Sequence, residues 1–179
     1  GKYGIDGFVD YPLYGAVKQS LAKRDASLRP LYDVWEYNKT FYDRPYLLGS
    51  FLDNHDNVRF TKLVIDHRNN PISRMKVAMT YLFTAPGIPI MYYGTEIAMT
   101  GGPDPDNRRL MDFRADPEII DYLKKVGPLR QQLPSLRRGD FTLLYEQDGM
   151  AVFKRQYKDE TTVIAINNTS ETKHVHLTN

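Results

Sequence analysis

The sequence predicts an α/β fold with a parallel sheet, followed by a small antiparallel β domain. Up to residue 133, short apolar runs that suit buried strands alternate with amphipathic segments that suit helices. Strands that alternate with helices indicate a parallel sheet. From Gly139 the pattern changes to short strands separated by turns, which is typical of hairpins. We therefore expect one domain over residues 1–137 and a second, antiparallel β domain over residues 138–179.

The N-terminal segments predict a strand and two helices. A short strand is expected at residues 4–9, and Pro12 after it suits the first turn of a helix. The helix that follows has an apolar face, because its apolar residues recur four positions apart at Leu13, Val17 and Leu21. A second helix is expected to begin after Ser27, because serine is a common N-cap residue.

Two further apolar runs predict the other strands of the parallel sheet. Residues 47–53 form a continuous apolar run that ends in an acid, as expected for a strand buried on both faces. A polar loop follows, and Asn70-Pro71 is expected to begin a helix that Pro86-Gly87 ends. Residues 88–93 then predict a third buried strand.

The last part of the chain predicts one more helix and four strands. The helix is expected to begin at Asp116-Pro117-Glu118 and to be kinked or interrupted at Gly127-Pro128, since proline lacks the N–H that a helix needs. The antiparallel strands are expected at residues 141–145, 150–157, 161–167 and 173–177.

Composition excludes several classes of function. A net charge of +2 over 179 residues gives no electrostatic basis for a nucleic-acid or anionic-membrane partner. The absence of cysteine excludes disulfides and thiolate metal sites. No apolar run approaches the roughly 18 residues that a transmembrane helix needs, and the N-terminus is unlike a signal peptide. We expect a soluble protein of the bacterial cytoplasm or periplasm.

The densest chemical signal is the segment from Phe51 to Asp56. It ends a buried strand with two acids and a histidine, Asp53, His55 and Asp56, within four positions. Parallel α/β folds place their catalytic groups at this end of the strands. The same residues also suit an ordinary acidic turn, so the spacing alone leaves both interpretations open.

Four ordered motifs resemble the α-amylase superfamily of glycoside hydrolases, family 13. Residues 51–56 resemble its fourth signature region, and residues 87–96 are similar to its eighth barrel strand and the following turn. Residues 104–109 resemble the next loop, and residues 134–141 resemble the junction with the C-terminal β domain. The loop is most similar to that of neopullulanases and cyclomaltodextrinases.

The resemblance implies a (β/α)8 TIM barrel, of which this chain would carry strands six to eight and an incomplete C-terminal β domain. Such a barrel needs about 250 residues. Members of the family are retaining enzymes that cleave α-glucosidic bonds in starch-derived glucans, maltodextrins or cyclodextrins. Their nucleophile and acid/base carboxylates lie upstream of the region matched here. We therefore expect this chain to be a C-terminal fragment that is inactive by itself.

The same resemblance assigns roles to five residues. Asp56 matches the catalytic carboxylate that stabilises the oxocarbenium-like transition state. His55, Asp104, Arg108 and Tyr93 match substrate-binding positions. The alternatives are a loop imidazole bonded to backbone for His55 and a rigidifying ion pair for Asp104 with Arg108. Of Tyr92 and Tyr93, we expect one to face the ligand and the other to lie in the core, because neighbouring strand residues point to opposite faces.

The expected partner is an α-glucan oligosaccharide. No cofactor or metal site is expected within the chain, because His174 and His176 lack a third ligand, and calcium would belong to the upstream part. Homo-oligomerisation stays open, since members of this subgroup often pair through an additional N-terminal domain. A transglycosylase would use the same residues. The alternative of another class is a non-catalytic, amylase-like scaffold or carbohydrate-binding protein.

Overall fold

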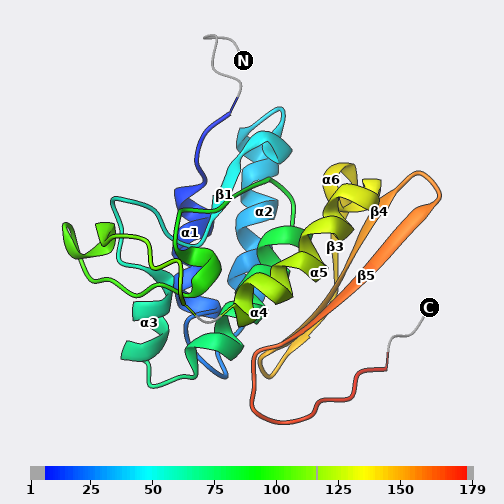
Figure 1. Ribbon diagram of the computed structural model, residues 1–179. Helices are drawn as coiled ribbons and strands as arrows, with labels where there is room; N and C mark the ends of the chain where they lie inside the picture. The colour runs from blue at the N-terminus through cyan, green and yellow to red at the C-terminus, as the bar shows by residue number, and fades with distance from the viewer. Residues whose placement is uncertain (1–6, 116, 177–179) are drawn as a thin grey trace.

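The computed structural model describes residues 7–115 and 117–176 of the chain. Figure 1 shows a three-stranded sheet along one side of the molecule, and α4, α5 and α6 lie between this sheet and the part that holds β1. The elements, in chain order, are α1 (Tyr11–Ser20), α2 (Arg29–Phe41), η1 (Pro45–Leu47), β1 (Gly49–Phe51), α3 (Phe60–Asp66), α4 (Pro71–Thr84), β2 (Ile88–Ile90), η2 (Thr95–Ile97), η3 (Asp106–Arg108), α5 (Glu118–Gln132), α6 (Pro134–Arg138), β3 (Asp140–Gln147), β4 (Met150–Tyr157) and β5 (Glu160–Asn167).

The predicted parallel pairing is present. β1 and β2 pair in parallel, with Gly49 opposite Ile88. Val9 adds a single parallel bridge to Gly49. Residues 4–6 of the first predicted strand lie outside the described residues, and of the remainder only Val9 forms a bridge. Three successive chain segments therefore run side by side in one direction, and helices connect them.

β1 is buried along its whole length, but β2 is not. The side chains of Ile88 and Ile90 are 49% and 40% exposed, so the prediction of a third buried strand is wrong. The reason is that β2 pairs only with β1 in the described part of the chain, and its other edge has no neighbour there. An apolar run in the sequence indicates that a strand can be buried, but it does not indicate which element covers the strand.

Side-chain caps begin two helices, of which the sequence predicted the start at Asn70. The Asp10 carboxylate accepts a hydrogen bond from the Leu13 N–H, and the Asn70 side chain accepts one from the Ser73 N–H at 2.9 Å. The N-cap of α2 is Leu28 rather than Ser27. The Ser27 hydroxyl oxygen still accepts a hydrogen bond from the N–H of Arg29, the first residue of α2.

Three sequence predictions differ from the local structure. α5 continues through Pro128, so the predicted interruption is absent, because its packing against α4 outweighs one missing hydrogen bond. The alternative of a kink at Gly127-Pro128 stays a prediction, and Asp116, expected at the start of this helix, lies outside the described residues. α3 forms in a segment expected to be a polar loop, with Phe60 and Val64 buried on one face. Residues 173–176 of the fourth antiparallel strand lie in no strand, since β5 pairs only with β4 among the described residues.

The antiparallel sheet packs directly on the helices. β3 and β4 pair, β4 and β5 pair, and the sheet's inner residues join the same apolar cluster as the helices. The Phe153 ring meets the Tyr81 ring of α4 edge-on, with centroids 6.4 Å apart. Phe141 packs against Tyr32 and Trp35 of α2. The sheet therefore supports α4, the second of the two helices between β1 and β2. The boundary at 137/138 stays a prediction.

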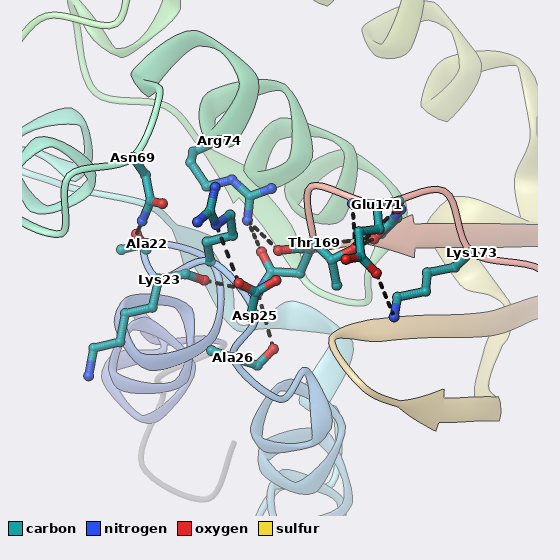
Figure 2. A network of polar contacts seen from close by, with 12 residues as sticks. Ala22, Lys23, Asp25, Ala26, Asn69, Arg74, Thr169, Glu171 and Lys173 are labelled. Atoms are coloured by element: carbon teal, nitrogen blue, oxygen red, sulfur yellow. Dashed lines mark hydrogen bonds and ion pairs between the residues drawn. The ribbon is translucent and has the colours of Figure 1, made fainter.

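One buried amide holds the end of β5 against the end of α1 and the segment that follows it. The Asn168 side chain is fully buried, and its Nδ2 donates to the carbonyls of Ser20, Lys23 and Ala26 at 2.8, 2.9 and 3.1 Å. Its Oδ1 accepts a hydrogen bond from Arg74 of α4. Figure 2 shows Lys23, Ala26 and Arg74 close together in this network. Three separate parts of the chain, residues 20–26, α4 and the end of β5, thus meet at one side chain.

Two buried arginines donate hydrogen bonds to the carbonyls at the C-terminus of α4. Arg155 of β4 donates to the Thr84 carbonyl at 2.5 Å, and Arg130 of α5 donates to the carbonyls of Phe83 and Ala85 at 3.1 and 3.0 Å. The last carbonyls of a helix have no partner within it and carry a partial negative charge, so cations are favourable there. Burial lowers the pKa of both guanidinium groups to about 10, which leaves them charged at neutral pH.

We predict that Asn168→Ala lowers the free energy of unfolding by about 3 kcal/mol, because three buried carbonyls lose their donor and the Arg74 guanidinium loses one of its two acceptors on Asn168. Urea denaturation measures the loss. Asn69→Ala is the control, since Asn69 in the same region donates one hydrogen bond, to the Ala22 carbonyl at 3.2 Å, and should cost less than about 1 kcal/mol. Equal losses for the two variants would contradict the assigned importance of Asn168.

Candidate active site

The chain passes from core to surface directly after β1. Leu52 and Asp53 are buried, whereas the side chains of His55 and Asp56 are 61% and 56% exposed. The turn is held locally, because the Asn54 Oδ1 accepts a hydrogen bond from the Asp56 N–H at 2.9 Å. The carboxyl end of β1 therefore presents an imidazole and a carboxylate to solvent.

Asp53 is a structural acid rather than part of the exposed pair. Its carboxylate accepts hydrogen bonds from the Phe60 N–H at 3.0 Å and from the Thr95 hydroxyl at 2.6 Å. Burial raises the pKa of Asp53, although both hydrogen bonds act in the opposite direction. Through these contacts the end of β1 is tied to the first residue of α3 and to η2.

The structure brings four of the five predicted site residues together. The His55 Nε2 lies 3.3 Å from the Asp56 Oδ1, and an Arg108 guanidinium nitrogen lies 3.9 Å from the same oxygen. The Arg108 Nε also forms an ion pair with Asp104 at 2.8 Å. The guanidinium therefore lies between two half-exposed carboxylates. Residues more than fifty positions apart in sequence form one polar cluster.

The fifth residue, Tyr93, is placed differently from the prediction. β2 ends at Ile90, so Tyr92 and Tyr93 do not alternate about a strand, and neither enters the core. Both rings lie over the Arg59 guanidinium, with centroids at 4.1 and 4.8 Å. The Tyr93 hydroxyl donates to the backbone carbonyl of Arg109 at 2.7 Å. Tyr92, 6.3 Å from the His55 ring, is the tyrosine beside the cluster.

Arg59 organises the loops around the site, and the sequence prediction missed it. Its side chain is fully buried and donates to the Tyr93 carbonyl at 2.6 Å and to the Asn107 carbonyl at 2.9 Å. Its remaining nitrogen contacts the Met99 sulfur at 3.6 Å. A basic residue in a polar loop normally suggests exposure, so only its place directly after the motif could have drawn attention to it.

Asn107 is the second buried connector. Its Nδ2 donates to the carbonyls of His55 and Asn57 at 2.8 and 3.0 Å, and the Nε of Arg108 donates to the same His55 carbonyl at 3.1 Å. The loop that carries Asp104 and Arg108 is thus fastened to the loop that carries Asp56, consistent with Asn107 shaping the loop.

Residues 7–115 and 117–176 offer neither a metal-binding cluster nor a membrane-spanning helix. No group of three or more His, Asp or Glu side chains there could hold a metal ion. No helix in that part is long and apolar enough to span a membrane. His174 and His176 both precede the undescribed C-terminal residues and belong to no strand.

Comparison with known proteins gives consistent matches. A family model described as the α-amylase C-terminal domain matches residues 139–179. A cyclomaltodextrinase from Thermoanaerobacter pseudethanolicus is 32% identical, covering 97% of this chain and 30% of that protein. A cyclomaltodextrin glucanotransferase from Bacillus sp. strain 17-1 is 30% identical, covering 89% of this chain and 22% of the relative. The chain therefore spans less than a third of the length of these curated relatives.

Solved structures agree with these matches. The crystal structure of an α-amylase from Geobacillus thermoleovorans, complexed with acarbose, is 92% identical with a TM-score of 0.97, covering 99% of this chain and 40% of that one. An α-amylase from Anoxybacillus is 65% identical with a TM-score of 0.95, covering 97% of this chain and 38% of that one.

We predict that Arg59→Lys loosens the loop over residues 93–109. Lysine keeps the charge but lacks the planar fork that reaches two carbonyls at once, so amide hydrogen exchange in this loop should become faster. Arg109→Lys is the control, because Arg109 is half-exposed and pairs only with Asp106 among the described side chains. Unchanged exchange in Arg59→Lys, measured by mass spectrometry, would show that Arg59 does not hold the loop.

Proposed function

Since this chain belongs to the α-amylase superfamily of glycoside hydrolases, we propose that it forms the C-terminal part of a retaining enzyme. The enzyme would cleave α-glucosidic bonds in starch-derived glucans, maltodextrins or cyclodextrins. The observation that carries the proposal is the exposed cluster of His55, Asp56, Asp104 and Arg108 at the carboxyl end of a parallel strand. The cyclomaltodextrinase and α-amylase among its relatives support the substrate class.

In this proposal the segment at Val9, β1 and β2 are strands six to eight of a (β/α)8 barrel. Their parallel order and the helices that connect them support that assignment. Active sites of such barrels are built from the loops at the carboxyl ends of the strands. The loops after β1 and β2 carry the cluster, as the barrel requires. The half-exposed edge of β2 suits a strand that has a further neighbour in the complete barrel.

Asp56 would stabilise the transition state. Glycosidic cleavage builds positive charge on the sugar ring, and a carboxylate beside that ring favours the charge as it develops. The Asp56 carboxylate is half-exposed, and its ion-pair contacts within the described residues are at 3.3 and 3.9 Å, which leaves room for a sugar hydroxyl. His55 would donate a hydrogen bond to the same sugar. The nucleophile and the proton donor would be supplied by residues outside this chain.

Asp104 and Arg108 would bind a neighbouring sugar unit. Their 2.8 Å ion pair uses one carboxylate oxygen and one guanidinium nitrogen, so acceptor and donor positions remain on both side chains for vicinal hydroxyls. The two roles weighed for this pair, rigidity and sugar contact, are compatible with each other. Tyr93 would contribute its ring, because its hydroxyl is bonded to the Arg109 carbonyl.

We predict that Asp56→Asn in the full-length protein lowers kcat on maltodextrin by about 10²- to 10³-fold, since an amide cannot balance the developing positive charge. Release of reducing ends measures the rate. Asp66→Asn is the matched control, because Asp66 is an exposed acid on α3 that pairs with Lys62. An unchanged kcat in Asp56→Asn would refute the role. A full-length protein that binds maltodextrin without cleaving it would be the non-catalytic sugar-binding alternative.

We also predict that the 179-residue chain by itself does not hydrolyse maltodextrin. Retaining cleavage needs two carboxylates about 5 Å apart on either side of the scissile bond, and the proposal places both upstream of Gly1. A sensitive assay with chromatographic detection of products tests this, with the full-length enzyme as positive control. Cleavage by the purified chain at a rate that follows its concentration would show that the nucleophile lies within it.

A further inference from the structure

We infer that Asn107 is a positioning residue for Asp56, acting through the backbone on both sides of the acid. The inference rests on the proposed function, because it concerns how the transition-state carboxylate is held. Asn107 lies on η3, in the loop after β2, and its side chain is fully buried. Among the described residues its side chain makes no hydrogen bond to the Asp56 carboxylate, so its effect on the acid is transmitted by the main chain.

The Asn107 side chain bonds the backbone on both sides of Asp56. The Asn107 Nδ2 donates one hydrogen bond to the carbonyl of His55 at 2.8 Å and one to the carbonyl of Asn57 at 3.0 Å. These are the residues immediately before and after Asp56. Because both neighbours can only accept, the NH₂ end of the amide must face them, and both of its hydrogens are used.

A third backbone group of the turn is also held. The Asp56 N–H donates to the Asn54 Oδ1 at 2.9 Å. The main chain around Asp56 is therefore fixed at three points, while its carboxylate stays half-exposed and, among the described residues, contacts His55 at 3.3 Å and Arg108 at 3.9 Å. A rigid backbone below a free functional group is the arrangement that preorganised sites require.

Asn107 is itself held tightly. The Arg59 Nε donates to the Asn107 carbonyl at 2.9 Å, and the Gly101 backbone lies so close that an added Cβ would be 2.9 Å from the Asn107 Cα. The next residue, Arg108, donates to the His55 carbonyl and pairs with Asp104. Asn107 therefore also sets the spacing between Asp56 and the proposed sugar-binding pair.

A double-mutant cycle in the full-length enzyme tests the inference. Asn107→Asp keeps the size of the side chain but turns an oxygen toward two carbonyls, which should displace the turn. A displacement of about 1 Å can cost about 10²-fold in rate, so we expect kcat on maltodextrin to fall by about that factor. In an Asp56→Asn background the further loss should be less than about threefold, because the group that Asn107 positions is already gone.

Asn168→Asp is the matched control. Asn168 is also a fully buried amide whose Nδ2 donates to backbone carbonyls, but it lies at the end of β5, outside the site. This variant should lower the melting temperature while leaving kcat unchanged at temperatures where circular dichroism shows the protein folded. If Asn107→Asp does not fold, Asn107→Ala provides the same cycle, since alanine removes both donors without adding a charge.

The outcomes separate the inference from the proposed function. A loss of the same size from Asn107→Asp in both backgrounds would mean general damage and would overturn the inference, while a large loss from Asp56→Asn alone would still support the function. Wild-type kcat in both Asn107→Asp and Asp56→Asn would overturn the inference and the proposed function together. A kcat loss in Asn168→Asp as large as that in Asn107→Asp would also overturn the inference, because any buried amide would then have the same effect.

Discussion

Backbone carbonyls buried outside any helix or strand ladder impose the main constraint on this structure. An unpaired buried carbonyl costs about 1–3 kcal/mol, and this chain buries many of them where helices end and loops cross. Arg130 and Arg155 satisfy those at the end of α4, and Asn168 satisfies three in and after α1. Each of these side chains carries several donors, so one residue can fix several chain segments at once.

The candidate active site is also held by buried side chains that donate to backbone carbonyls. Arg59 and Asn107 are fully buried, and each donates to backbone carbonyls of a neighbouring loop. Of the groups proposed to meet the sugar, Asp56 and His55 are exposed and contact each other only at 3.3 Å. Rigidity and chemistry are therefore assigned to different residues. A buried donor holds the backbone in place, and the exposed side chain remains available for a ligand.

The antiparallel sheet contributes to the site through α4. Phe153 and Arg155 of β4 contact α4 by ring packing and by a hydrogen bond to its last turn. α4 lies between β1 and β2 in the chain, and the loops of the site follow those two strands. The sheet thus fixes the position of the strands from which the site is built, although no residue of the sheet belongs to the cluster.

The sequence by itself determined most of the local elements and the chemical candidates. Short continuous apolar runs located the parallel strands, and Asn70 marked a helix start. The motif after β1 identified His55 and Asp56 as candidate site residues. Only the tertiary structure decided that β2 is half-exposed and that Arg59 and Asn107 are buried connectors. Periodicity and capping depend on neighbours in sequence, whereas these hydrogen bonds join residues about fifty positions apart. Which donor meets which carbonyl is therefore fixed only when the loops meet in space.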